Sequence, residues 1–206
     1  MDRKKQLEEI KQKIETELEC PLKEAATQIV FGKGNCEAEI MFIGEAPGQK
    51  EDEQGIPFVG AAGRELNKLL QSIGLSLDEA YIANILKYRP PQNRDPKPEE
   101  IARHTPYLIE QIKTIQPKIM LTLGNFSTKF VLSGFSVERM KTIPGVSAIH
   151  GKIHEVRVDG MKFKVVPLYH PAAMLYKPPL RKVLEEDFVK VAEILGKKAS
   201  VQRKLA

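Results

Sequence analysis

The chain has 206 residues, of which 42% are apolar and 29% are charged, a composition that excludes a disordered chain or a fibre and is typical of one compact globular domain. Lysine and arginine exceed the acidic residues by 32 to 27, and this net charge of +5 is compatible with nucleic-acid binding without establishing it. No apolar stretch reaches the roughly 20 residues of a membrane-spanning helix, and the charged first residues do not fit a signal peptide. The presence of two cysteines suits a reducing compartment. We therefore expect a cytoplasmic protein without membrane association.

The first predicted element is an amphipathic helix over about residues 2–20, which Pro21 ends. Its apolar residues recur at steps of three and four among charged neighbours: Leu7, Ile10, Ile14 and Leu18. A short apolar run at residues 40–43 then predicts a buried strand that leads into the turn-rich residues 44–48. A second helix is expected to end at Gly74. Its apolar side chains share one face: Leu66, Leu69, Leu70 and Ile73.

Strand and helix patterns continue to alternate in the rest of the chain. The predicted elements are a strand at 81–86, a proline-rich loop at 90–98, a helix at about 99–115, a strand at 119–123, a short helix at 124–132, paired strands at 152–158 and 162–167, and a helix at 180–195. Pro106 is expected to kink or break the helix that contains it. Asp159 and Gly160 are typical of a two-residue type I′ turn, which predicts a hairpin around them.

This order of elements predicts an α/β fold, with a single three-layer α/β/α domain and a central, mainly parallel sheet. The one domain spans residues 1–206. Within it we expect the N-terminal helix at about 2–20, the core at about 21–195 and a basic C-terminal tail at about 196–206. The composition contains no linker or repeat that would indicate a second domain.

Polar residues gather where the predicted strands end. Glu45, Asn84 and His170 each lie at or just beyond such an end, so we expect them to line one pocket. Residues 44–48 follow a strand as a phosphate-binding loop does, but neither glycine-rich nucleotide motif occurs, nor does a nucleophile elbow or an H-E-x-x-H pair. The two cysteines and four histidines show no zinc-ligand spacing. The sequence therefore does not support a nucleotide hydrolase or a metal site.

Four motifs occur in a fixed order: residues 44–48 (GEAPG), 55–60 (GIPFVG), Asn84 followed by 88–94 (YRPPQNR), and 170–172 (HPA). This set resembles the uracil-DNA glycosylase superfamily, specifically its bacterial and archaeal family 4, over about residues 20–195. The resemblance implies a four-stranded parallel sheet between helices. It also implies a monofunctional hydrolase that cuts the N-glycosidic bond of uracil in DNA, leaves an abasic site and acts in base-excision repair.

The resemblance assigns roles to individual residues. Glu45 and His170 are implied to be catalytic, with His170 stabilising the departing uracil anion and Glu45 positioning water and stabilising the sugar cation. Phe58 is implied to stack on the flipped base, while Asn84 reads its edge. The other implied contacts are Ala46, Pro47 and Glu51 around uracil, with Glu51 against the methyl group of thymine, and Met174 and Leu175 as an apolar wedge in the DNA stack.

The chain departs from the family at one place. Family 4 enzymes usually hold an iron–sulfur cluster with four cysteines, and here Cys20 alone stands at such a position. Glu17, Tyr88 and His104 occupy the other three, and Cys36 lies elsewhere. A single thiolate cannot hold the cluster, so we expect no metal and no cofactor. Packing is expected to replace it, with Tyr88 and the N-terminal helix as substitutes.

Two alternatives stay open beside a uracil-DNA glycosylase. A DNA-binding relative without catalysis would keep the fold and the basic surface, and the missing cluster ligands are compatible with it. A nucleotide-binding α/β protein would use residues 44–48 as an anion nest. For the glycosylase, the expected partner is uracil-containing DNA. We expect a monomer, and a sliding clamp stays open as a further partner.

Overall fold

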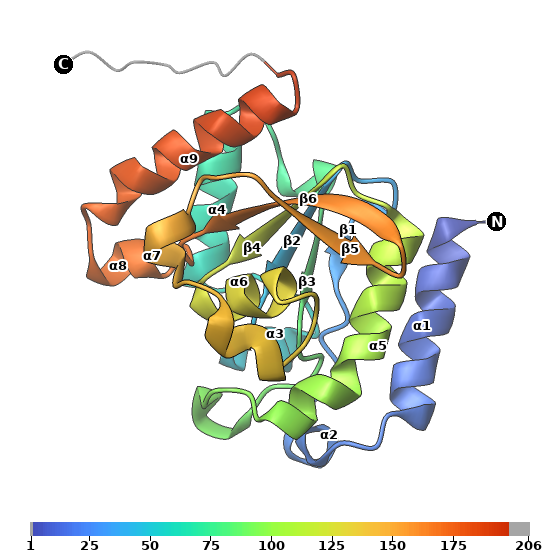
Figure 1. Ribbon diagram of the computed structural model, residues 1–206. Helices are drawn as coiled ribbons and strands as arrows, with labels where there is room; N and C mark the ends of the chain where they lie inside the picture. Colours follow the sequence, from blue (N-terminus) through green and yellow to red (C-terminus); the bar gives the residue numbers. More distant parts are fainter. Residues whose placement is uncertain (1, 198–206) are drawn as a thin grey trace.

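Figure 1 shows a computed structural model of the protein, in which residues 2–197 are described. Its centre is a six-stranded sheet with the order β1-β3-β2-β4-β6-β5. The strands are β1 (Lys33–Gly34), β2 (Ile40–Gly44), β3 (Ala80–Asn84), β4 (Ile119–Leu123), β5 (His154–Val158) and β6 (Met161–Leu168). β3, β2, β4 and β6 pair in parallel, whereas β1 and β5 pair antiparallel at the two edges. The prediction of an α/β domain with a mainly parallel sheet is confirmed, and two antiparallel edge strands are added to the four parallel ones.

Helices cover both faces of this sheet. They are α1 (Arg3–Glu17), α2 (Pro21–Ala25), α3 (Gln49–Gln54), α4 (Ala61–Ser72), α5 (Pro98–Ile115), α6 (Asn125–Leu132), α7 (Val146–Ile149), α8 (Ala173–Tyr176) and α9 (Leu180–Ile194). In Figure 1, α4 and α9 lie on one side of the sheet, and α1, α5 and α6 lie on the other. The three predicted layers are therefore present.

β2 shows why a central strand of this sheet can be apolar at every position. Met41 and Ile43 belong to the core beneath α1, α5 and α6, whereas Ile40 and Phe42 belong to the core beneath α4 and α9. Phe42 packs on Phe188 of α9 with the ring centroids 6.4 Å apart. A parallel strand with helices on both faces has no solvent side, so alternation of apolar and polar residues disappears.

Some local predictions are confirmed and others are wrong. Asp159 and Gly160 join β5 to β6 with φ angles of +46° and +84°, which confirms the predicted hairpin turn. α1 ends at Glu17, and Pro21 begins α2 instead of ending α1. α5 is a single helix that contains Pro106, so the predicted break does not occur.

Two short helices follow the ends of parallel strands, α3 after β2 and α8 after β6. The predicted basic tail lies outside the described residues from position 198 onward. In the part of the chain that the structure describes, no helix combines the length and apolar character that crossing a membrane requires.

Candidate active site

The sheet brings the predicted site residues together at one edge. Gly44 of β2 pairs with Asn84 of β3, and Leu123 of β4 pairs with Leu168 of β6, so these four strands end side by side. A cavity of about 470 Å³ opens beyond their carboxyl ends. The residues predicted for catalysis and uracil binding all line it: Glu45, Ala46, Pro47, Glu51, Phe58, Asn84 and His170.

Asn84 lines this cavity and has a buried amide oxygen that is unpaired. The residue is 2% exposed, and its Oδ1 has no hydrogen-bond partner. Gly44 makes this placement possible, because a Cβ atom there would overlap Oδ1 and would lie 3.2 Å from Cε2 of Phe58. A buried acceptor without a donor costs about 1–3 kcal/mol, so this atom fits a site that a ligand completes.

Phe58 is held in an uncommon backbone conformation, with a φ angle of +56°. Only a glycine fits at position 63, since a Cβ atom there would collide with the Phe58 carbonyl oxygen. The Phe58 ring lies near the His170 ring, with centroids 5.8 Å apart and planes 30° apart. A residue with a strained backbone persists where the surrounding structure holds it in place. Here that conformation places the Phe58 ring as an aromatic wall of the cavity.

His170 has a defined tautomer. Burial lowers the pKa of its imidazole, although the nearby Glu51 carboxylate acts in the opposite direction, so the ring is neutral at pH 7. The Ala172 N–H donates to Nδ1 over 3.2 Å, which makes Nδ1 an acceptor. The ring proton of the neutral imidazole is therefore on Nε2, and Nε2 is a hydrogen-bond donor.

Two carboxyl groups, those of Glu45 and Glu51, line the cavity. Burial raises the pKa of Glu45 to about 7, and the negative charge of Asp95 adds to this effect. Glu51 belongs to α3, and its Oε1 accepts a hydrogen bond of 2.9 Å from the Gly60 N–H at the start of α4. Glu45 can thus change its charge near neutral pH, while Glu51 is fixed in place by a backbone donor.

Comparison with known proteins agrees with this geometry. The family model of the uracil DNA glycosylase superfamily matches residues 31–195. The chain belongs to this superfamily. It is 46% identical over 192 residues to a type-4 uracil-DNA glycosylase of Archaeoglobus fulgidus, covering 93% of this chain and 94% of the relative. A type-4 uracil-DNA glycosylase of Saccharolobus solfataricus is 49% identical over 87% of this chain and 82% of its own length. A type-4 uracil-DNA glycosylase of Thermotoga maritima is 34% identical over 95% of this chain and 97% of its own length.

The predicted DNA wedge of this uracil-DNA glycosylase superfamily member needs one correction. Met174 is 4% exposed and belongs to the core beneath α4 and α9, so it is not available to enter a DNA stack. Leu175 is 46% exposed and Tyr176 is 84% exposed. The three residues share the short helix α8, and its turn directs Met174 inward and the next two residues outward.

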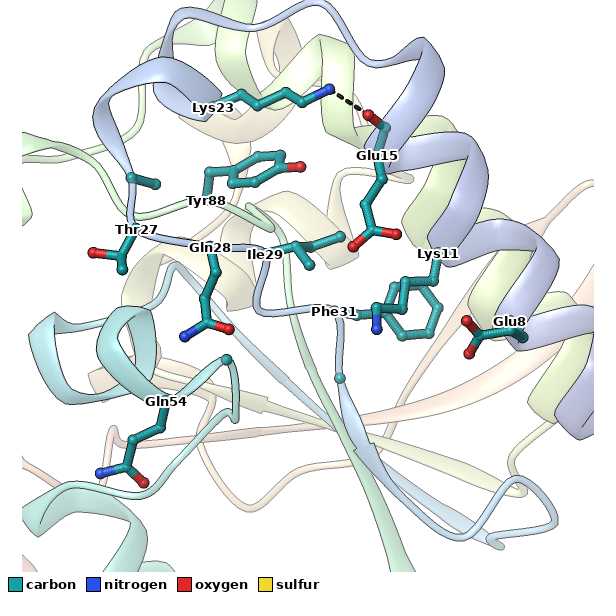
Figure 2. Close-up of a pocket in the computed structure, with 13 residues that line it drawn as sticks. Glu8, Lys11, Glu15, Lys23, Thr27, Gln28, Ile29, Phe31, Gln54 and Tyr88 are labelled. Atoms are coloured by element: carbon teal, nitrogen blue, oxygen red, sulfur yellow. Dashed lines mark hydrogen bonds between the residues drawn. The ribbon is translucent and has the colours of Figure 1, made fainter.

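Three of the four positions at which the resemblance expects cluster ligands lie in a second region, which we call the Cys20 corner and define as Cys20, Tyr88 and His104. Cys20 is 7% exposed, Tyr88 is 3% exposed and His104 is fully buried. The Tyr88 and His104 rings pack edge to face with centroids 6.2 Å apart. Figure 2 shows the Tyr88 hydroxyl pointing toward α1, close to the hydrogen bond from Lys23 to the carbonyl of Glu15.

The Cys20 corner does not fit an iron–sulfur cluster. It offers one thiol, a phenol and an imidazole where thiolates are required. His104 Nδ1 lies 2.7 Å from the Glu100 carbonyl, which requires a proton on Nδ1 and leaves Nε2 as a bare acceptor without a partner. Burial lowers the pKa of His104 to about 4, so the ring stays neutral. Within residues 2–197, no group of three or more histidine, cysteine or acidic side chains is placed to hold a metal ion.

Sequence reasoning missed some residues of the cavity. Pro90, Asn93 and Arg94 line it, and the motif at residues 88–94 contained that signal. Ala62 lines it without any signal in the sequence. The sequence also contained no signal that Asp95 would raise the pKa of Glu45, because this effect arises from the approach of two loops.

Proposed function

We propose that this protein is a uracil-DNA glycosylase that hydrolyses the bond between uracil and deoxyribose in DNA and leaves an abasic site for base-excision repair. The observation that carries the proposal is the buried, unpaired Oδ1 of Asn84 in a cavity walled by Phe58. The type-4 uracil-DNA glycosylases that resemble this chain over most of its length support the same activity.

Asn84 selects uracil by its hydrogen-bonding edge. The target base leaves the duplex, enters the cavity and stacks on Phe58. Oδ1 of Asn84 accepts the N3–H of uracil, and Nδ2 donates to O4. Cytosine has no N3–H and carries an amino group at the neighbouring position, so both contacts would fail. Each buried group left unsatisfied costs about 1–3 kcal/mol, which excludes cytosine.

His170 and Glu45 stabilise the charges that develop as the bond breaks. The electron pair of the glycosidic bond leaves with uracil, and Nε2–H of His170 donates to O2 of the resulting anion. The sugar becomes cationic, and the Glu45 carboxylate stabilises it and orients the attacking water. Water adds its oxygen to the sugar, and its proton is released. Among the cavity-lining residues of the described chain, Arg94 carries a positive charge and none is a lysine. A lysine amine that could act as a nucleophile is therefore not among them, in keeping with a monofunctional enzyme.

The remaining contacts complete the proposal. Ala46 and Pro47 line the cavity beside Glu45. Glu51 is held by the Gly60 N–H, and we propose that it excludes the 5-methyl group of thymine. Leu175 is the exposed apolar residue that fills the gap left by the flipped base.

We further propose that the enzyme works without a cluster, as a monomer in the cytoplasm. Both cysteines are free thiols, which suits a reducing compartment. After anaerobic reconstitution with iron and sulfide, the purified protein should contain no stoichiometric iron and should keep full activity. Iron near four atoms per chain, with activity that depends on it, would contradict the cofactor-free enzyme.

The test of function is the release of free uracil from a single oligonucleotide that contains it. Wild-type protein should release uracil and leave an alkali-labile abasic site, and the matched cytosine oligonucleotide should stay intact. Asn84→Asp should release uracil more slowly and tolerate cytosine better, whereas Asn35→Asp, on an exposed turn, should behave as wild type. DNA binding without release would favour the inactive relative. Nucleotide binding without DNA binding and without uracil release would favour the nucleotide-binding alternative with an anion nest at residues 44–48.

A further inference from the structure

Lys87 is a buried cation that the proposed reaction does not use. It lies three residues after Asn84 and is fully buried, and it is the one lysine or arginine in that state among residues 2–197. None of the ion pairs in that part of the chain includes it. Burial lowers the pKa of its ammonium group to about 7. Burying an amine in this way is costly, so its contacts indicate what it stabilises.

The amine of Lys87 binds two acceptors from different parts of the chain. Nζ donates to the main-chain carbonyl of Asn84 over 2.7 Å and to Oε1 of Gln111 over 2.6 Å. Asn84 ends β3, whereas Gln111 lies on α5 and is fully buried. Lys87 therefore connects the strand that carries Asn84 to the helix that covers the sheet.

Gln111 is itself fixed, so it can anchor Lys87. Its Nε2 donates to the carbonyl of Phe31 over 3.0 Å and to the hydroxyl of Tyr81 over 3.2 Å. The Phe31 carbonyl can only accept, which identifies the end of the amide that faces it as nitrogen and turns Oε1 toward Lys87. The whole network is buried, where each hydrogen bond is stronger than it is in water.

The effect at Asn84 follows from the peptide group between residues 84 and 85. Its N–H, from Ile85, donates to the carbonyl of Gly44 over 3.0 Å. Its carbonyl, from Asn84, accepts from Lys87. β1 reaches along β3 only as far as Ile82, so no strand supplies a donor to the Asn84 carbonyl on that side. The peptide group is thus held at both ends, and its orientation sets the direction of the Asn84 side chain.

We propose that Lys87 is a positioning residue for base selection, holding the main chain of Asn84 so that the amide faces the edge of the flipped uracil. This inference rests on the proposed reading of uracil by Asn84. The predicted consequence is a loss of rate in the chemical step and not in DNA affinity, since phosphate contacts dominate affinity.

A double-mutant cycle tests the assignment. Single-turnover excision of uracil is measured at several enzyme concentrations for wild type, Lys87→Met, Asn84→Ala and the double variant. Methionine keeps the length of the side chain and removes the donor. We expect Lys87→Met to lower the rate at saturation about tenfold while the half-saturating concentration changes by less than about twofold. In the Asn84→Ala background, the same substitution should lower the rate by less than about threefold, because no amide is left to position.

Tyr81→Phe is the matched control. It removes another buried hydrogen bond of Gln111 but leaves the contact between Lys87 and Asn84 in place, so its rate should stay within about twofold of wild type. If Lys87→Met does not fold, Gln111→Leu replaces it, since this variant keeps Lys87 and removes its anchor.

The possible results separate the two proposals. A wild-type rate for Asn84→Ala would overturn the reading of uracil by Asn84, and this inference with it. A slow Asn84→Ala beside an unchanged Lys87→Met would overturn the role of Lys87 alone. Equal losses from Lys87→Met in both backgrounds, or an equal loss in Tyr81→Phe, would show that Lys87 acts through general stability and would overturn the positioning role.

Discussion

The cavity at the carboxyl edge of the sheet and the Cys20 corner each contain a buried polar atom without a hydrogen-bond partner. In the cavity it is Oδ1 of Asn84, and in the corner it is Nε2 of His104. Asn84 borders about 470 Å³ of open space, whereas His104 is fully buried and packs against the ring of Tyr88. An unpaired atom therefore points to a ligand only where space for that ligand adjoins it.

The two regions also differ in how burial changes acidity. Burial raises the pKa of Glu45 in the cavity to about 7 and lowers that of His104 in the corner to about 4. Both shifts favour the neutral group, because a low-dielectric environment penalises charge. Of these two groups, the carboxyl group of Glu45 titrates near neutral pH and the His104 ring does not, so chemistry is expected in the cavity and packing in the corner.

The largest expected effect comes from removing a catalytic group from the cavity. His170→Ala and Glu45→Gln should each lower the single-turnover rate of uracil excision about 100- to 1000-fold, because each group acts only on charge that develops in the transition state. The measurement uses saturating enzyme and fixed salt. His104→Leu is the control from the Cys20 corner, and its rate should match wild type. A loss of rate in His104→Leu as large as in His170→Ala would remove the distinction between the two regions.

Phe58→Ala should have the next largest effect. Stacking of a base on an aromatic ring contributes roughly 1–3 kcal/mol, which corresponds to a loss of about 5- to 150-fold in excision at subsaturating enzyme. Tyr88→Phe keeps the ring in the Cys20 corner and should leave excision unchanged. Unaltered excision by Phe58→Ala would mean that the aromatic wall of the cavity does not contact the base.

The pH dependence of excision should reflect Glu45. With a pKa of about 7, the reactive carboxylate increases about tenfold in population between about pH 6 and 8, and the rate should rise with it. Glu45→Gln should abolish this rise. A pH profile of Glu45→Gln with the same rise as wild type would assign the titration to another group.

Folding stability should change with pH in the opposite direction through the same carboxyl group. The folded protein holds the Glu45 proton up to about pH 7, whereas the unfolded chain releases it near the ordinary value of 4.5. Between these two values the folded state binds more protons, so this group makes the free energy of unfolding fall as pH rises. Comparing chemical denaturation of wild type and Glu45→Gln over this range isolates the contribution.

The smallest expected effects on excision separate two neighbours on α8. Leu175→Ala should lower excision from duplex DNA a few-fold with little change in stability, because Leu175 is an exposed apolar residue outside the core. Met174→Ala should instead lower the free energy of unfolding by about 2–5 kcal/mol, since it removes a core side chain. Thermal unfolding and excision are measured on the same preparations. The opposite pattern would restore Met174 as the wedge.

Local patterns in the sequence were sufficient for much of the fold. β4 occupies residues Ile119–Leu123, the same limits that its mostly apolar run predicts, because a strand buried on both faces is rich in apolar residues. The turn at Asp159 and Gly160 could be predicted because few residues adopt positive φ angles easily. Glu45, Asn84 and His170 were predicted from their positions at the ends of strands, where a parallel sheet brings distant loops together, whereas the resemblance supplied the other cavity residues.

Other features depend on contacts between residues far apart in the chain, and only the tertiary structure decided them. α5 continues through Pro106 because its buried face, including Leu108 and Ile112, packs in the core with α1, and that packing outweighs one lost backbone hydrogen bond. Met174 is buried because α8 lies against the core beneath α4 and α9. Lys87 and Gln111 are 24 positions apart in the sequence and contact each other in the fold. No local pattern predicts that the Lys87 side chain is buried and that its amine donates to the Asn84 carbonyl. Local sequence determines dihedral preference and periodicity, whereas burial and the charge state of a side chain are set by whatever the fold places around it.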